Sequence, residues 1–222
     1  METNSVMTAL YNALPLLLKG LILTMQVTFF AMLVGFSIGL ILGILSSNRL
    51  KKPLISNAIM LYVTIIRGTP IYVQILIVYY ALPDLLGINL SPLIAGILAL
   101  GCNSIAYVTE IIRGGINSVP VGQWEACHVL GYSFIKTLIT IIIPQMLKNN
   151  IPSLTSELTT LLKETSILGT IGLLELTKVG SNLNARILQP MPIYLTIALF
   201  YLILIISMTI LSKIIEKGLQ YD

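Results

Sequence analysis

The sequence is short of charged residues. Of its 222 residues, 13 are Lys or Arg and 9 are Asp or Glu, which makes 10% of the chain charged. An average soluble domain carries about 25%. Hydrophobic residues make up 56%, so the chain lacks the side chains needed to build a polar surface. This composition excludes a soluble globular domain, a disordered tail and a nucleic-acid-binding module, and nucleic acid is not an expected partner. What remains is a protein surrounded largely by lipid.

Cysteine and histidine are also scarce. The chain has two cysteines, Cys102 in an apolar run and Cys127 in a polar loop, and one histidine, His128. These residues form neither a disulfide framework nor a group with metal-ligand spacing, so no metal site is predicted. The sequence also lacks the phosphate-binding pattern G-x-x-x-x-G-K-[ST] and the catalytic patterns G-x-S-x-G and H-E-x-x-H. We therefore expect no enzyme activity, and no cofactor bound by this chain.

Long stretches without charge are typical of membrane-spanning helices. Three such stretches, 20–48, 85–109 and 187–212, each exceed the roughly 20 residues that a helix needs to cross the hydrocarbon core. Two more segments are apolar but interrupted by a few charges. The short alternating segments of a β-barrel are absent, so helices must satisfy the backbone in lipid. We predict an all-α integral membrane protein with one transmembrane domain over 1–222. Its five predicted spans are about 18–46, 55–82, 91–113, 150–172 and 191–214.

Basic residues predict the orientation, because loops rich in Lys and Arg stay in the cytoplasm. The segment after the first span, the long loop after the third and the C-terminal segment are all basic, whereas the loop after the second span holds only Asp84. The N-terminus is therefore expected outside and the C-terminus inside. One segment fits this orientation poorly, since the outer connection between the fourth and fifth spans carries Lys178 and Arg186 against Glu175.

Two spacings predict structural contacts rather than a ligand site. Gly35, Gly39 and Gly43 repeat every four residues in the first span, a small-xxx-small pattern that favours close helix packing. Glu110 and Arg113 lie three residues apart near the cytoplasmic end of the third span. That spacing predicts an ion pair on one face of the helix.

A long polar loop, 114–148, joins the third and fourth spans, and connections of this length are often functional. Gly114-Gly115 predicts a break after the third span. A short amphipathic helix is expected next, and Gly131 can end it in the left-handed conformation. A second helical stretch follows until Pro144, which is expected to stop it. The loop therefore predicts two short helices at an angle on the cytoplasmic face.

The spacing within this loop is specific. It runs Glu125-Ala126-Cys127, three residues, Gly131, nine residues, and Ile141-Ile142-Ile143-Pro144. This resembles the EAA loop of ABC-importer permeases, which reads Glu-Ala-Ala, three residues, Gly, nine residues and Ile-x-Leu-Pro. Cys127 and Ile143 depart from the pattern, both conservatively. Other stretches resemble the polar amino-acid uptake family, of the histidine, arginine and glutamine permease type. They are Arg67-Gly68-Thr69-Pro70 with Gln74, residues 103–116, and Lys163-Glu164-Thr165-Ser166. The resemblance covers the chain from about Gly20 to Lys217.

The resemblance implies a type I ABC-importer permease fold and a set of partners. In that family the loop is a coupling helix, which sits in a cleft of a separate ATP-hydrolysing subunit. The residues expected to couple to that subunit are Gln123, Trp124, Glu125, Ala126, Cys127, His128 and Gly131. The implied partners are two ATPase subunits that bind ATP and Mg, a second permease subunit, identical or similar, and an extracytoplasmic amino-acid-binding protein. The implied location is a bacterial inner membrane.

The residues of the loop suit this coupling role physically. Trp124 offers a large apolar anchor, of the kind that is common at interface hot spots. Glu125 offers a charge that can pair with a partner or cap a helix, and Gly131 fixes the angle between the two helices. The alternative is an amphipathic loop that lies on the lipid headgroups.

Polar residues inside the apolar spans are the candidates for a substrate path. Ionisable groups at membrane depth are costly and usually face the bundle interior or an aqueous cavity. Helical spacing gathers such residues into one stripe on the third span and one on the fourth. The candidates are Gln74, Asn103, Ser104, Tyr107, Glu157 and Thr160. The alternative, interhelical hydrogen bonding that holds the bundle together, stays open for Gln74 and Asn103.

Glu157 carries a hypothesis about selectivity. Its carboxylate could meet the α-ammonium group or the cationic side chain of an amino acid, which favours basic substrates such as arginine, lysine or histidine. The function implied by the resemblance is import of polar amino acids by alternating access, driven by the separate ATPase. A different class, an ion-gradient-driven carrier or channel without an ATPase, could use Glu157 and Glu164 as a proton relay. Co-purification of an ATPase would separate the two.

Overall fold

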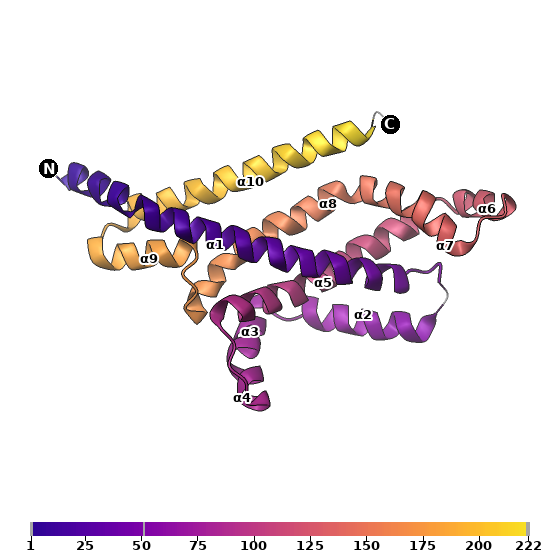
Figure 1. Ribbon diagram of the computed structural model, residues 1–222, viewed down its shortest axis with the longest axis horizontal. Helices are drawn as coiled ribbons and strands as arrows, with labels where there is room; N and C mark the ends of the chain where they lie inside the picture. The colour runs from indigo at the N-terminus through magenta and orange to yellow at the C-terminus, as the bar shows by residue number, and fades with distance from the viewer. Residues whose placement is uncertain (1, 51, 221–222) are drawn as a thin grey trace. The chain divides into compact units, whose positions relative to one another are not determined.

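The computed structural model describes residues 2–50 and 52–220, and every element in this part of the chain is helical (Figure 1). The α-helices are α1 (Glu2–Leu45), α2 (Pro53–Arg67), α3 (Ile71–Leu76), α4 (Leu82–Leu86), α5 (Pro92–Ser118), α6 (Val121–Val129), α7 (Phe134–Thr137), α8 (Ile143–Glu164), α9 (Leu176–Ile187) and α10 (Pro190–Gln220). Two π-helical turns, η1 (Ile77–Ala81) and η2 (Leu138–Ile142), and one 3-10 helix, η3 (Thr165–Ile171), complete the path. The predicted all-α fold is confirmed.

Three of the described helices are long and apolar enough to cross a membrane. They are Tyr11–Leu45 within α1, Pro92–Ser118 and Pro190–Gly218 within α10. The helices on either side of the break after α2 pass the same test only when they are taken together, which would make four spans. The helix α8 is not among them, since charges, amides and hydroxyls interrupt its apolar residues. Neither the predicted count of five nor the predicted orientation is confirmed.

The predicted span 55–82 is interrupted at Gly68. The helix α2 ends at this point, and α3 begins only after Pro70, whose backbone is extended with φ −63° and ψ 134°. Pro70 has no N–H to continue the helical hydrogen bonds, and its ring disfavours a helical conformation at Thr69. The span is therefore two helices rather than one.

The chain divides into two compact units, each assembled from separate segments. The first unit consists of residues 1–32, 70–101 and 158–208. Its main core is a cluster of buried apolar side chains, Val27, Ala31, Ile75, Ala95, Ala99, Leu100, Leu161, Leu168, Ile171 and Leu173. A second cluster joins α1, α9 and α10 through Leu17, Leu176, Ile193 and Ile197. The start of α1 and the late helix α9, far apart in sequence, therefore share one core.

The second unit consists of residues 33–69, 102–157 and 209–222. Within it, α1 packs closely on α5 through a ladder of small residues. Gly35, Gly39 and Gly43 of α1 lie against Ser104, Val108 and Ile112 of α5. A Cβ atom added at Gly39 would lie only 2.8 Å from Cβ of Val108, so a larger residue does not fit. The close packing predicted from these three glycines is confirmed.

The predicted break at Gly114-Gly115 is wrong. The helix α5 continues through both glycines to Ser118. A Cβ atom at Gly115 would collide with Asn150 and Met146 of α8. Gly115 is therefore a packing position that lets α8 approach α5, and the helix does not end there.

The predicted stop at Pro144 is also wrong. The helices α7, η2 and α8 follow one another without a break, and Pro144 lies in the first turn of α8. The preceding turn is π-helical, with the N–H of Ile143 bonded to the carbonyl of Leu138. A proline inside a continuous helix removes one hydrogen bond and crowds the preceding turn, and here the wider π-helical turn lies where that crowding would fall.

Candidate functional site

The short helix α6 ends in a Schellman motif at Gly131. The φ angle of this glycine is +76°, in the left-handed region. Its N–H donates to the carbonyl of His128 at 3.0 Å, and the N–H of Tyr132 donates to the carbonyl of Cys127 at 2.9 Å. These are the two hydrogen bonds of the motif, and glycine adopts this conformation without a steric penalty. The predicted left-handed end of this helix is confirmed.

Trp124 on α6 is braced against its own chain. Its indole stacks on the ring of Phe134, with 5.8 Å between the ring centroids. The guanidinium of Arg49, from the connection between α1 and α2, lies 5.6 Å from the indole centroid, which is cation–π distance. A nitrogen of the same guanidinium donates to the carbonyl of Val119 at 3.4 Å. The half-buried Trp124 therefore holds the loop against the connection between α1 and α2, and its role as an anchor for a partner stays a prediction.

Other residues of this loop form its outer surface. Cys127 is buried and Gln123 is half-buried, whereas Glu125, Ala126 and His128 are exposed. Two large apolar side chains at the end of this helix are also exposed, Val129 at 85% and Leu130 at 73%. We did not single these two out from the sequence, although apolar residues just before a helix-ending glycine were a usable signal. The end of α6 therefore exposes the apolar side chains of Val129 and Leu130 beside the ionisable side chains of Glu125 and His128. An exposed apolar patch of this kind is typical of a surface that binds a partner protein.

The three path candidates on α5 have different environments. Asn103 is 4% exposed, and Ser104 is fully buried against Gly35 of α1. Tyr107 is half-buried, with the Arg67 guanidinium 5.0 Å from its ring centroid. Ser104 therefore lies inside the α1–α5 contact, and Tyr107 is covered on one side by a cation.

The other three candidates come from α3 and α8. Glu157 is 7% exposed and Gln74 is 9% exposed, while Thr160 is half-buried. Glu157 belongs to the second unit, and Gln74 and Thr160 to the first. Glu157 and Gln74 are thus buried within the chain, and Thr160 is partly covered. Burial of this kind suits a lined path and interhelical hydrogen bonding equally.

Glu110 and Arg113 form the ion pair that their spacing predicted. A terminal guanidinium nitrogen of Arg113 lies 2.6 Å from one carboxylate oxygen, and Nε lies 3.2 Å from the other. Such two-pronged pairs are geometrically specific. These charges are therefore engaged within α5, as expected for a helix-end contact.

Glu175 is a structural residue that the sequence analysis treated only as a charge. It is fully buried and caps α9, accepting the N–H groups of Thr177 at 2.8 Å and Lys178 at 2.6 Å. The hydroxyl of Tyr201 donates to the same carboxylate at 3.1 Å. Burial raises the pKa of the Glu175 carboxyl, and the hydrogen bonds that it accepts oppose that rise. The carboxylate oxygens of Glu175 are therefore occupied by the N–H groups at the start of α9 and by Tyr201.

The described part of the chain offers little for metal or disulfide chemistry. Cys102 and Cys127 are free thiols, one exposed and one buried. Within residues 2–50 and 52–220, no three His, Cys, Asp or Glu side chains gather closely enough to hold a metal ion.

The helical membrane fold and the Gly131 loop define a class of transport protein. A family model described as the inner membrane component of binding-protein-dependent transport systems matches residues 35–221. The chain belongs to this family.

Relatives that match most of this chain are permeases for amino acids. The arginine transport system permease protein ArtQ of Bacillus subtilis (strain 168) is 34% identical over 207 residues, with 93% of this chain and 94% of that protein covered. The putative glutamine transport system permease protein GlnP of Rickettsia conorii (strain ATCC VR-613 / Malish 7) is 37% identical over 210 residues, with the same two coverages. A crystal structure of an amino acid ABC transporter with histidines matches with a TM-score of 0.83 and 34% identity, over 95% of this chain and 97% of that one. The resemblance to amino-acid ABC permeases is confirmed.

Proposed function

We propose that this chain is the membrane permease subunit of an ATP-driven importer for polar amino acids. The observation that carries the proposal is the loop from α6 to α7, in which the EAA-type spacing coincides with a left-handed Gly131 and an exposed apolar end of α6. The names of the relatives, which include an arginine permease, support the substrate class. The chain itself hydrolyses nothing, and ATP and Mg bind to a partner ATPase.

The coupling step would begin at the exposed end of α6. One ATPase subunit would bind the loop of this chain in a cleft. A second ATPase subunit would bind the corresponding loop of the second permease subunit. Val129 and Leu130 would fill the cleft, and Glu125 and His128 would set its polar rim. The contacts of Arg49 and Trp124 would then carry the movement of the loop to α1.

The proposed topology keeps five spans in a single domain over 1–222, in a bacterial inner membrane. The helix α8 would be the fourth span, screened from lipid by its neighbours because its polar residues cannot face hydrocarbon. The N-terminus would lie outside, where an extracytoplasmic binding protein delivers substrate, and the C-terminus inside.

Transport would follow alternating access. ATP would close the ATPase pair, the coupling loops would approach, and the path would open outward. Gln74, Asn103, Tyr107, Glu157 and Thr160 would line or border that path, with the buried Ser104 as a packing neighbour. Glu157 would favour basic amino acids such as arginine, histidine or lysine, by attraction to their second positive charge.

The test is reconstitution. The permease is purified with an ATPase from the same cell, placed in liposomes, and assayed for amino-acid uptake and ATP hydrolysis across a panel of amino acids. Uptake that requires ATP, with hydrolysis stimulated by one or a few polar amino acids, is the expected result. Uptake driven by a proton or sodium gradient without any ATPase would overturn the proposal. It would favour a carrier that uses Glu157 and Glu164 for proton transfer.

A further inference from the structure

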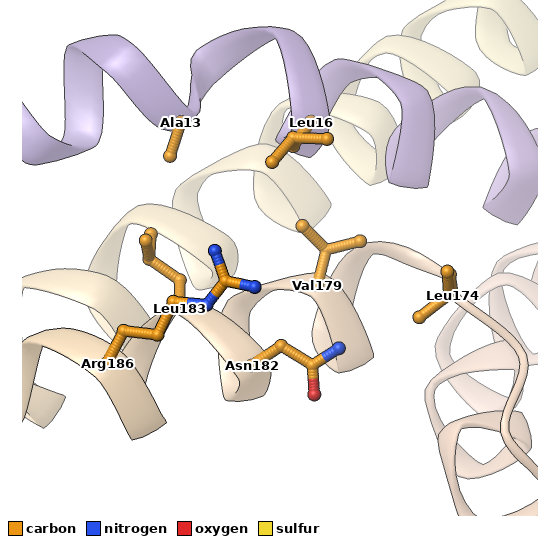
Figure 2. Close-up of a pocket in the computed structure, with 7 residues that line it drawn as sticks. All are labelled: Ala13, Leu16, Leu174, Val179, Asn182, Leu183 and Arg186. Carbon is orange, nitrogen blue, oxygen red and sulfur yellow. The ribbon is translucent and has the colours of Figure 1, made fainter.

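A small cavity lies between α1 and α9 within the first unit (Figure 2). Its volume is about 140 Å³. Five apolar side chains form most of its wall, Ala13 and Leu16 from α1 with Leu174, Val179 and Leu183 from the region of α9. Two polar side chains, Asn182 and Arg186, complete the lining. The cavity is therefore a mostly apolar space that ends on a single positive charge.

The helices position this cavity through a close contact at one end. A Cβ atom added at Gly20 of α1 would lie 3.0 Å from Cα of Leu176, at the start of α9. Val179, Leu183 and Arg186 follow at steps of four and three residues, so they share the helix face turned to α1. Figure 2 shows these three side chains directed toward α1, with the guanidinium of Arg186 beside Leu183 on the α9 side of the cavity.

The charge of Arg186 is available to a ligand. Within the described residues, no carboxylate lies at ion-pair distance from its guanidinium. Glu175, the acidic residue near Arg186 in the sequence, is buried. Its oxygens accept hydrogen bonds from the first N–H groups of α9 and from Tyr201. Arg186, Leu16 and Leu174 are all exposed, so the cavity is open to the surroundings of the first unit.

We propose that this cavity binds an anionic phospholipid, with an acyl chain along its apolar wall and the phosphate on Arg186. The planar guanidinium matches a phosphate oxygen pair with two parallel hydrogen bonds. Apolar walls beside one basic group match an anionic lipid, which has both an acyl chain and a charged headgroup. A small soluble anion would contact the basic group but would gain nothing from the apolar walls. The site also gives a role to Arg186, which lies in a segment that the proposed topology places outside, where positive charge is otherwise disfavoured. Only the choice of leaflet rests on the proposed function.

The experiment measures which lipid the full-length chain retains. The chain is reconstituted with equimolar phosphatidylglycerol and phosphatidylcholine, extracted in mild detergent, and its bound lipids are counted by native mass spectrometry. The wild type is expected to retain phosphatidylglycerol preferentially, and Arg186→Gln to lower that preference about fivefold. Ala13→Leu, which fills the cavity without changing charge, is expected to lower retention of both lipids. Lys178→Gln removes a charge two turns away outside the lining and is the matched control, expected to behave as wild type.

Several outcomes would overturn the proposal. Unchanged preference in Arg186→Gln, or an equal loss in Lys178→Gln, would mean that the cavity does not select the headgroup. Displacement of the bound lipid by excess inorganic phosphate would identify a simple anion site. If Arg186→Gln loses affinity for the extracytoplasmic binding protein but still retains lipid, the cavity surface would be a docking site for that protein instead. The lipid readout needs neither ATP nor transport, so it fails or succeeds separately from the proposed function.

Discussion

Gly131 offers the sharpest test of the coupling loop, because replacing it strains the backbone without crowding any neighbour. Its φ angle is +76°, and a Cβ atom added there would meet nothing within 4 Å. The whole cost of Gly131→Ala is therefore conformational, about 1–2 kcal/mol for an L-residue in the left-handed region. That cost reduces the population of the intact motif by a factor of about 5–30. Asparagine tolerates this region better and a β-branched residue worse, so the effect should grow from Gly131→Asn through Gly131→Ala to Gly131→Val.

The assay is substrate-stimulated ATP hydrolysis by the reconstituted complex, measured beside membrane insertion of each variant. We expect insertion to stay normal while stimulation and uptake fall in the stated order. Gly87 provides a matched control, since it has φ +64°, nothing within 4 Å of an added Cβ, and a position at the end of α4. Gly87→Ala therefore applies the same strain away from the loop. Normal coupling in Gly131→Val, or an equal loss in Gly87→Ala, would refute the assignment of this loop.

Three further predictions test other contacts. Gly39→Leu should lower the thermal unfolding midpoint in detergent, because overpacking against Val108 costs about 1–3 kcal/mol; an unchanged midpoint would contradict the α1–α5 ladder. Glu157→Gln should reduce uptake of arginine more than uptake of glutamine, and equal changes in both would dismiss its role in selectivity. Arg49→Gln should lower substrate-stimulated ATP hydrolysis about two- to fivefold through loss of its contact with Trp124, while Arg49→Lys keeps part of it. Loss of ATPase co-purification in Arg49→Gln would instead point to a direct interface role.

Local patterns in the sequence predicted several contacts correctly. The left-handed end at Gly131, the ion pair of Glu110 with Arg113, and the packing of Gly35, Gly39 and Gly43 all follow from short-range spacing and backbone preference. Each depends on residues within a few positions, or on a general property of glycine. Such signals can be read from one sequence without knowing what lies across from them.

The wrong break at Gly115 and several contacts that the sequence did not predict share a different cause, since each depends on a partner that is distant in the sequence. Gly115 was expected to break its helix, but Asn150 fills the space that the glycine leaves. The contact of Trp124 with Arg49 could not be predicted from the loop alone, because Arg49 lies far away in the sequence. The burial of Ser104 against Gly35 likewise depends on another helix, and its role on the substrate path stays a prediction. A pattern within one helix does not say which other helix lies across from it.

One hydrogen bond joins α1 to the start of α9. It has a consequence for biosynthesis. The N–H of Leu176 donates to Oγ1 of the fully buried Thr24 at 3.2 Å, across 152 residues of chain. At synthesis rates of roughly 5–20 residues per second, α1 leaves the ribosome roughly 8–30 seconds before this partner exists. Throughout that interval the surface around Thr24 has no native neighbour from α9. The helix α1 thus completes this contact only after α9 has been made, and its surface must until then be tolerated by lipid or by the insertion machinery.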